Sequence, residues 1–374
     1  MNPPALIGVY HNCENIFLHQ TTLVKELIRI FGPLVAIIVF LNVYHESSEG
    51  MLSVGNYPVW MKDASGNRTD QTSGMTYAGS ENGYKTFVAC DDIGKINRIR
   101  VNENVNPPEL EITEIKYSAE VQTLFDKFKK TDMEDIYYDS ANSKIYLAIE
   151  GHEYSSYDPE IYKKKEGVYE LTYNKDILTF DTLLTIRRLK LPEQVYKHTY
   201  DNISFEGIAL TENYLFLGLE NLQDSVNTFT DSTLIYIIDR KTKELVKTIN
   251  TREEKISTVC GLYAVDDYNL IGVDRNTRRM FYITFDEEFD IISTELEEMD
   301  LMIPGHKDIN KVLGIAVESV TMDEDGNIYC STDPWKDFYK PDLTERKRLS
   351  QEELNNFVEN VPIMYKFKKA VKKK

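Results

Sequence analysis

The chain alternates short apolar runs with turn residues, and five pairs of these runs share one pattern. In each pair a strand-like run carries Gly or Glu at a fixed place, turns sharply, and returns in a second run that ends on an acid. The outgoing runs are 73–77, 133–137, 205–209, 260–264 and 317–321, and the returning runs are 87–91, 146–150, 216–220, 271–274 and 329–333. The pattern predicts five antiparallel hairpins whose marked residues face one rim of a repeat protein.

Turn-forming residues stand midway between the outgoing and returning runs. Asn82-Gly83 and Asp325-Gly326 tolerate the positive φ that tight hairpin turns require. Further strand-like runs lie between the hairpins, which begin 55 to 72 residues apart. Four strands per repeat is the blade plan of a β-propeller. The chain is therefore predicted to be all-β, a β-propeller of five four-stranded blades, with room for a sixth in the longest interval.

Composition divides the chain into three parts and limits its partners. Residues 51–367 carry the repeats and are predicted to form one monomeric propeller, flanked by residues 1–50 and by a basic tail, 368–374. Charged residues make up 28% of the chain and the formal net charge is −18, which argues against nucleic acid as a partner. The 4 cysteines lack the spacing of a disulfide framework and are expected to be buried apolar residues.

Residues 27–44 form a strongly apolar run near the amino terminus. The length of this run is at the lower edge for a membrane-spanning helix. Lys25 and Arg29 lie on its amino side, whereas Glu46 and Glu49 follow it, so the positive-inside rule places the propeller outside the cytoplasm. We expect a hydrophobic helix that anchors the propeller to a membrane. A cleaved signal, which would make the protein secreted, and a helix packed on the propeller are the alternatives.

Two amphipathic helices are expected as insertions in the propeller. Residues 347–361 place Leu354, Phe357 and Val358 on one face, and Ser350 with Glu353 forms a capping box at the start. Residues 119–130 show the same periodicity. Both segments are predicted to be packing helices.

Glutamates recur at the marked position of three outgoing strands, as Glu134, Glu206 and Glu318, where the other two strands carry Gly74 and Gly261. If these strands line the central channel, three carboxylates converge near the axis, and their repulsion favours a neutralising cation. Ca²⁺ accepts oxygen ligands of this kind, whereas the absence of His and Cys disfavours Zn²⁺. We therefore expect Ca²⁺ at these three glutamates. The alternative is that they satisfy neighbouring backbone N–H groups and fix the register.

The acids that end the returning strands would form a second ring on the same face, and for Asp91 and Asp333 a solvated rim is the simplest account. This ring consists of Asp91, Glu150, Glu220, Asp274 and Asp333. His152 lies next to Glu150, and Arg275, next to Asp274, is placed to bind a phosphate or carboxylate. Arg275 could equally pair with Asp274 or Glu220. The candidate catalytic residues are Glu150, His152, Glu220, Asp274 and Arg275.

These positions lie in motifs that resemble the phytase-like β-propeller family, described as "esterase-like activity of phytase". The matching segments are 132–136 with 149–150, 202–209 with 219–220, 272–276, and 317–321 with 325–327. The resemblance extends from about residue 73 to residue 333. It implies that the three glutamates and the acids at 150, 220 and 274 form the family's shared site. Asp135 stands where that family more often has Gly.

Three functions are consistent with these features. The first is an extracytoplasmic, calcium-dependent hydrolase of phosphate esters, in which Glu150 acts as general base and Arg275 stabilises developing charge on a small anionic substrate. The second is a non-catalytic surface module in which Ca²⁺ is structural and the rim binds a glycan, peptide or protein. The third is a nucleotidase similar to the calcium-activated apyrases, against which the lack of obvious aromatic and basic nucleotide contacts argues.

Overall fold

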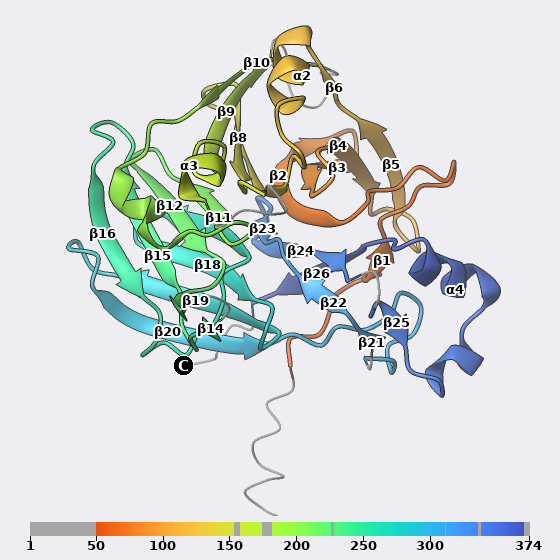
Figure 1. Ribbon diagram of the computed structural model, residues 1–374. Coiled ribbons are helices and arrows are strands. Elements are labelled where there is room, and N and C mark those ends of the chain that lie inside the picture. Colours follow the sequence, from red (N-terminus) through yellow and green to blue (C-terminus); the bar gives the residue numbers. More distant parts are fainter. Residues whose placement is uncertain are drawn as a thin grey trace, which may run out of the picture. The chain divides into compact units, whose positions relative to one another are not determined.

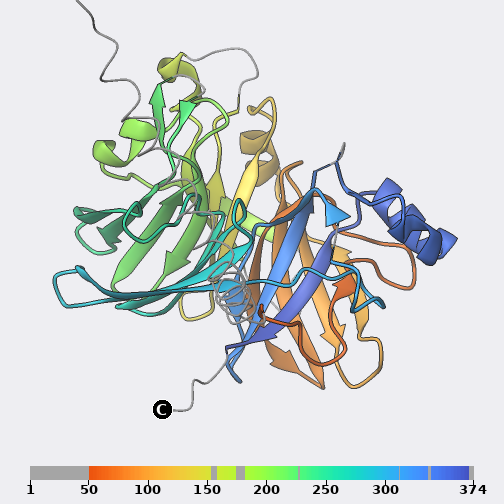
Figure 2. The ribbon, with the colours of Figure 1, turned by 90° about the horizontal axis from the view of Figure 1, so that it is seen from below.

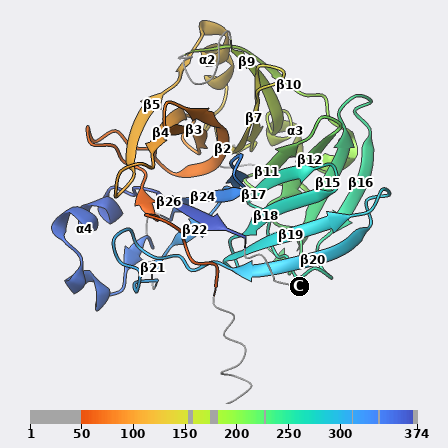
Figure 3. The ribbon, with the colours of Figure 1, turned by 180° about the vertical axis from the view of Figure 1, so that it is seen from behind.

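The fold is a ring of five antiparallel sheets around a central axis, shown along that axis in Figure 1. The computed structural model describes residues 50–152, 158–173, 182–225, 228–310, 312–335 and 338–369. Figure 3 gives the same ring from behind, with β2, β11 and β17 near its centre. The predicted all-β, five-bladed propeller is confirmed, and the described residues contain no sixth blade.

Four blades are continuous in sequence, and the antiparallel strands of each follow one another from the innermost strand outward. Blade 1 contains β2 (Thr72–Glu81), β3 (Tyr84–Asp91), β4 (Ile96–Asn102) and β5 (Glu109–Glu114). Blade 2 contains β7 (Met133–Asp139), β8 (Lys144–Ile149), β9 (Gly167–Tyr173), β10 (Thr182–Arg188) and the parallel edge strand β6 (Lys116–Tyr117). Blade 3 contains β11 (Phe205–Leu210), β12 (Tyr214–Leu219), β15 (Leu234–Asp239) and β16 (Leu245–Asn250). Blade 4 contains β17 (Gly261–Asp266), β18 (Asn269–Asp274), β19 (Arg279–Phe285) and β20 (Ile291–Glu298).

Blade 5 joins the two ends of the described chain and closes the ring. Its strands are β22 (Ile315–Val317) and β23 (Thr321–Met322), both paired with β24 (Asn327–Pro334), then β26 (Ile363–Lys368) and β1 (Val59–Trp60). Two small ribbons lie outside the blades: β13 (Gln223–Ser225) with β14 (Thr228–Phe229), and β21 (Val312–Leu313) with β25 (Lys340–Pro341). Because β1 pairs with β26, the first strand of the propeller completes the last blade.

The apolar core is divided into five clusters, one between each pair of neighbouring blades. Between blades 3 and 4, for example, Phe216 and Ile237 pack in one cluster with Leu262 and Phe281. Figure 2, turned by 90°, shows strands of the blades along their length. Since a blade is covered on both faces, strands such as β15 read as nearly continuous apolar runs rather than as an alternation.

Turn chemistry sets the hairpin register as expected. Asn82 and Gly83, in the turn between β2 and β3, have φ values of 53° and 83°, and Gly326 has a φ of 76°. Residues with positive φ in both central positions give a turn whose twist matches that of the flanking strands.

The fifth outgoing strand, predicted over 317–321, is broken. β22 and β23 flank Glu318, Ser319 and Val320, which belong to neither strand. The Ser331 N–H donates to the Ser319 hydroxyl oxygen at 2.8 Å, so a side chain replaces the backbone partner there. This substitution interrupts the ladder and lets the chain bend at Glu318.

The two predicted helices are present but shorter than expected. α4 spans Gln351–Val358 and follows the short 3₁₀ helix η2 (Glu345–Arg348) in the chain. The capping box of Ser350 and Glu353 is confirmed. α2 spans Ala119–Phe125, because the following turn is tightened by bonds from Lys127 N to Leu124 O and from Phe128 N to Phe125 O. The remaining helical elements are α3 (Pro159–Tyr162) and η1 (Glu193–His198).

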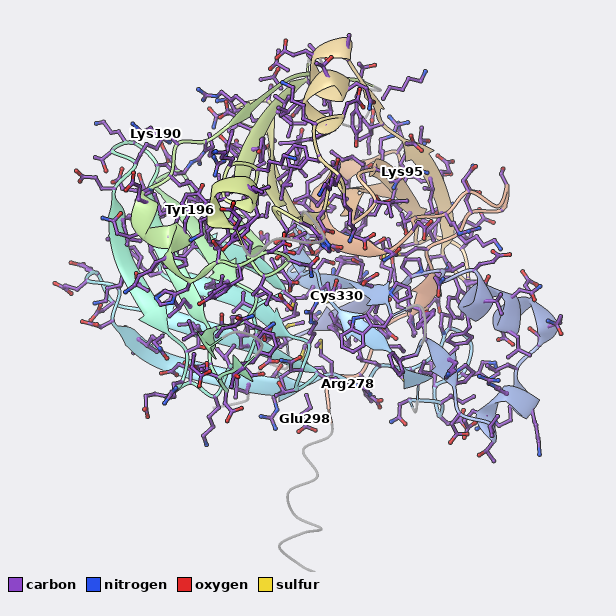
Figure 4. All side chains as sticks on the ribbon, in the orientation of Figure 1. Lys95, Lys190, Tyr196, Arg278, Glu298 and Cys330 are labelled. Atoms are coloured by element: carbon purple, nitrogen blue, oxygen red, sulfur yellow. The ribbon has the colours of Figure 1, made fainter. Side chains whose placement is uncertain are left out.

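Other predictions fall partly outside the described residues. The apolar run 27–44 and Cys13 lie outside them, and so do residues 370–374 of the basic tail. Among the residues that the structure does describe, no helix has the length and hydropathy of a membrane span. Cys90, Cys260 and Cys330 are buried free thiols; Cys330, on β24, is labelled in Figure 4.

Candidate functional site

The innermost strands approach one another closely at the predicted glycines. A Cβ on Gly74 would lie 2.5 Å from the Asp135 Cα, and one on Gly261 would lie 2.7 Å from the Glu318 carbonyl oxygen. These glycines therefore permit close backbone packing between neighbouring blades. Asp135 strengthens the next junction, since its Oδ2 accepts a 2.8 Å hydrogen bond from Ile208 N.

β-Bulges place two of the predicted glutamates at one end of the channel. The register of β7 on β8 shifts between Met133 and Asp135, and that of β11 on β12 shifts between Phe205 and Gly207. Glu134 and Glu206 are the extra residues at these shifts. A bulge re-aims a side chain out of the normal alternation. Glu318 lies in the corresponding break of blade 5.

The register corrects two of the five predicted residue pairs by one position. In blade 1 the shift lies between Thr72 and Gly74, so that Ser73, not Gly74, corresponds to Glu134. The amide groups of Asp92, Glu150 and Glu220 each donate to the carbonyl two residues before the bulge residue. The acid that returns in blade 1 is accordingly Asp92 instead of Asp91. In blade 4, the pairing of Gly261 with Val273 gives Cys260 and Arg275 the equivalent positions.

These equivalent residues form two rings at one end of the channel. The inner positions are Ser73, Glu134, Glu206, Cys260 and Glu318. The return positions are Asp92, Glu150, Glu220, Arg275 and Asp333. Arg275 therefore occupies the place of an acid in the fourth blade.

Arg275 binds carboxylates from two neighbouring blades. Its Nη1 lies 2.6 Å from Glu318 Oε1 and 3.4 Å from Glu206 Oε1, and its Nη2 is paired with Glu220. The alternative in which Arg275 pairs with Glu220 is thus what the structure shows, and Asp274 is not its partner. The ion pairs join blades 3, 4 and 5 at the axis.

The other half of the site is formed by acids of blade 2. One oxygen from each of Asp132, Glu134 and Glu150 lies within 4.8 Å of the other two, and Glu150 forms a second such triplet with Glu206 and Glu220. We call the six residues Asp132, Glu134, Glu150, Glu206, Glu220 and Glu318 the acid cluster. Asp132 is paired with Lys130 Nζ at 2.6 Å and with His152 Nδ1 at 3.3 Å.

Glu134 differs from the other members because the structure gives its carboxylate no hydrogen bond and no ion pair with a described residue. Burial raises its pKa well above the usual range, and the charges of Asp132, Glu150, Glu206 and Glu318 raise it further. Burial also raises the pKa of Glu150 and Glu206, although Arg275 acts in the opposite direction on Glu206. Glu206 Oε2 is buried without a hydrogen-bond partner among the described residues. If all six carboxyl groups were ionised, the cluster would carry more negative charge than its protein partners neutralise.

The donor set fits a hard divalent cation. The six carboxylates face two permanent cations, Arg275 and Lys130, and the second of these also pairs with Asp92 at 3.0 Å. Every donor in the two triplets is a carboxylate oxygen, the ligand type that Ca²⁺ prefers. The cluster is not sealed, since Glu134, Glu206 and Glu220 keep 8%, 7% and 8% of their surface exposed. Glu134, Glu150, Asp132 and Glu206 are the residues that would hold the ion.

A solvated rim was the simplest account for Asp91 and Asp333, but Asp91 is buried and Asp333 is half-buried. Asp91, Glu150, Glu220 and Asp274 are all buried. Asp274 accepts hydrogen bonds from Ser257 N at 2.8 Å and from Thr277 N at 3.1 Å, and it belongs to neither triplet. Asp91 accepts from Lys95 N, and burial raises its pKa to about 8.

Asp333 lies at the edge of the cluster and keeps its predicted return position. Burial and the charge of Glu318 raise its pKa, and its Oδ1 has no hydrogen-bond partner among the described residues. No role was predicted from the sequence for Asp132, Lys130 or Asp92. Asp132 and Asp92 are found only from the hydrogen-bond register of the strands. Asp132 lies two residues before the bulge residue Glu134, and Asp92 lies one residue after the predicted acid Asp91.

Comparisons with known proteins assign no family to the chain. No protein-family model matches the chain, and no curated protein matches its sequence. Among solved structures, a luciferin-regenerating enzyme is similar with a TM-score of 0.41 and 14% identity, over 74% of this chain and 73% of that chain. The PQQ-bound form of an aldose sugar dehydrogenase from Streptomyces coelicolor has a TM-score of 0.40 and 9% identity, over 84% of this chain and 99% of that chain. Similarities this low carry no argument about function.

Proposed function

We propose that the protein is a calcium-binding β-propeller whose acid cluster holds the ion at one end of the channel. The observation that carries the proposal is the Glu134 carboxylate, which is buried among Asp132, Glu150 and Glu206 without a cation or donor of its own among the described residues. Like charges this close stay ionised only if something neutralises them. The competing arrangement is a set of carboxyl groups that share protons.

Calcium binding by isothermal titration calorimetry tests this proposal after the protein has been treated with EDTA. We expect the wild type to bind Ca²⁺, and the affinity to rise as the pH rises because the raised pKa values make Ca²⁺ compete with protons. Glu134→Gln and Glu150→Gln should each weaken binding by about tenfold or more. Glu166→Gln is the matched control, since Glu166 is a fully buried glutamate outside the cluster. Equal affinity in all four proteins would contradict the proposal.

We propose further that the bound ion serves the hydrolysis of a phosphate ester, the activity implied by the resemblance to phytase-like propellers. A divalent ion polarises a phosphoryl oxygen and lowers the pKa of a coordinated water. His152, whose Nδ1 lies 3.3 Å from Asp132, is the chain's candidate for proton transfer, whereas Glu150, expected from the sequence to act as general base, would be a ligand of the ion. Glu134 and Glu206 would hold the ion, while Arg275 keeps Glu220 and Glu318 in place.

One observation favours the alternative of a non-catalytic module. Arg275, expected to stabilise charge on a substrate, is engaged by Glu206, Glu220 and Glu318. A site in which the arginine serves structure and the ion serves rigidity would bind a partner at the rim without turnover.

Turnover of p-nitrophenyl phosphate separates the two functions. The hydrolase predicts activity that EDTA abolishes and Ca²⁺ restores, with His152→Ala lowering kcat by about 100-fold. His306→Ala is a matched control, because His306 is also paired with a carboxylate, Glu353, at 2.8 Å but lies beside α4. Calcium binding without turnover on this and other phosphate esters would leave the non-catalytic module.

We also propose that the propeller lies outside the cytoplasm, where Ca²⁺ is abundant, and is held at a membrane by residues 27–44. The support is the charge asymmetry of Lys25 and Arg29 against Glu46 and Glu49. Added protease should digest the propeller on intact cells if this is correct. Protection until the cells are lysed would contradict it.

A further inference from the structure

A pocket lies at the opposite end of the blades from the acid cluster. It has a volume of about 770 Å³ and lies where blades 2 and 3 meet. The turn that follows β7, the turn that follows β11 and residues 240–243 after β15 line it, whereas the acid cluster lies where β7 and β11 begin. The two sites are therefore separated by the length of the inner strands.

The pocket carries a surplus of positive charge in a chain whose net charge is −18. Its five cationic side chains are Lys144, Arg187, Arg240, Lys241 and Lys243, and its three carboxylates are Asp139, Glu170 and Glu212. A local field opposite in sign to that of the whole protein favours anions at this place.

The three acids of the pocket do not neutralise its cations. Glu170 alone pairs with both Lys144 Nζ at 2.8 Å and Arg187 Nε at 2.7 Å, and it also accepts from the Tyr146 hydroxyl at 3.1 Å. Asp139 pairs with Arg240 at 3.0 Å. The terminal nitrogens of Arg187, whose side chain is 68% exposed, make no hydrogen bond with a described residue. Arg187 can thus present a planar pair of donors to a ligand.

The environment of Lys243 shows the same surplus of positive charge. Partial burial lowers its pKa, and the neighbouring charges of Arg240, Arg187 and Lys144 lower it further, although Glu170 acts in the opposite direction. Its exposed side chain lines the pocket and donates one hydrogen bond to the Arg240 carbonyl oxygen, which leaves two N–H groups for an anion that would relieve the repulsion.

Below these charges the pocket has an apolar lining. Leu189 and Leu191 contribute aliphatic surface, whereas Leu215 and Ile238 are 3% and 0% exposed and lie behind the pocket surface. The centre of the Tyr146 ring lies 5.7 Å from the Arg240 guanidinium carbon. Binding pockets for small molecules combine apolar walls with a few polar groups that fix orientation. This pocket is more strongly charged than that, because eight of its 20 lining residues carry acidic or basic side chains, and its cations are the orienting groups.

We propose that the pocket between blades 2 and 3 binds a small organic anion, with its phosphate or carboxylate on Arg187 and Lys243 and its apolar part on the leucines below. The pocket is independent of the cation site and of any reaction there. Phosphate and carboxylate headgroups share the chemistry that these cations recognise.

Ligand-observed NMR in EDTA tests the proposal, because the chelator removes any phosphate binding through Ca²⁺. The probes are phenyl phosphate and benzoate, which combine a ring and a charge, with phenol and inorganic phosphate as the separate parts. We expect a dissociation constant of about 1 mM or below for at least one ring-bearing anion. Phenol and inorganic phosphate should each bind about tenfold more weakly. Added salt should weaken binding further.

The variants locate the site. The double variant Arg187→Gln, Lys243→Gln should raise the dissociation constant of the ring-bearing anion by about tenfold or more. Lys190→Gln, an exposed lysine outside the pocket that is labelled in Figure 4, should bind as the wild type does. Thermal melting confirms that each variant is folded. Unchanged affinity in the double variant, phenol binding as tightly as the anions, or no binding of either anion would overturn the proposal.

Discussion

Arg275 is the cation in a ring of positions that otherwise carries acids, and it decides how the site is held together. Its guanidinium pairs with Glu206, Glu220 and Glu318, and burial leaves these three carboxylates little water to replace it. Removal of one partner from a buried ion pair is costly because the other charge stays buried.

Arg275→Met should therefore lower the free energy of unfolding at pH 7 by about 3–5 kcal/mol. The loss should shrink as the pH falls, because protonation of the three glutamates, whose pKa values burial raises, removes the charges that Arg275 neutralises. Arg279→Met, which breaks an exposed pair with Glu298, should change stability by less than about 1 kcal/mol. Urea denaturation of the two variants measures both effects. Equal losses would mean that Arg275 is not a structural cation.

Glu166 gives a pH dependence that is independent of the acid cluster. It is fully buried, accepts from the Thr199 hydroxyl, and burial raises its pKa to about 7. Since the folded state holds this proton between pH 4.5 and about 7 and the unfolded state does not, the contribution to stability is lost as the pH rises through that window.

The loss from Glu166 should amount to about 3 kcal/mol between pH 4.5 and pH 7.5. Glu166→Gln removes the titration, so the difference in unfolding free energy between this variant and the wild type should move in favour of the variant as the pH rises. Chemical denaturation across this range measures the difference. A difference that does not change with pH would contradict the assigned protonation.

The site was only partly accessible from the sequence. The repeat identifies Glu134, Glu206 and Glu318 because glutamate recurs at the same position of three outgoing strands. It does not reveal bulges, so the equivalence of Ser73 and Cys260 with these glutamates was missed by one position. It also does not reveal depth, since Asp91, expected on a solvated rim, is buried.

At the scale of the element, the glycines of the inner strands fix the distance between blades. Gly74→Ala would place a Cβ 2.5 Å from the Asp135 Cα, a contact that only backbone movement can relieve. We expect the free energy of unfolding to fall by about 1–3 kcal/mol. Glu81→Ala, an exposed change on the same strand, is the control and should be close to neutral. Denaturation midpoints compare the two, and an equally neutral Gly74→Ala would contradict the close packing.

The elements themselves were largely predictable, for local reasons. Apolar period, turn residues and the capping box at Ser350 are encoded within a few residues, and the structure contains the corresponding strands, turns and helix cap. The break at Glu318 was not predictable, because it depends on a hydrogen bond between the Ser319 hydroxyl and Ser331 on another strand. The end of α2 at Phe125 likewise depends on how the following turn packs.

At the scale of the whole molecule, closure of the ring joins residues from the two ends of the described chain. β1 pairs with β26, and Lys366 of β26 lies 2.9 Å from Glu103, which also accepts from the hydroxyl groups of Tyr57 and Tyr329. This partly buried set of contacts joins blade 5 to blade 1.

A chain that begins at Asp63 lacks β1 and should lose closure. It exposes the edge of β26 and the surface that Trp60 covers on Phe357. We expect it to melt at a lower temperature and to aggregate, whereas a chain that begins at Gly50 keeps every described strand and should melt cooperatively. Calorimetry of the two chains measures this, and identical melting would contradict closure through β1.

The most direct test of the calcium site is anomalous diffraction from crystals grown with and without CaCl₂. The account predicts a calcium peak at the acid cluster, about 2.3–2.6 Å from carboxylate oxygens of Glu134 and Glu150, and no peak there in Glu134→Gln crystals. An acid cluster without a peak in saturating calcium, with its carboxyl groups hydrogen-bonded to one another, would contradict the account.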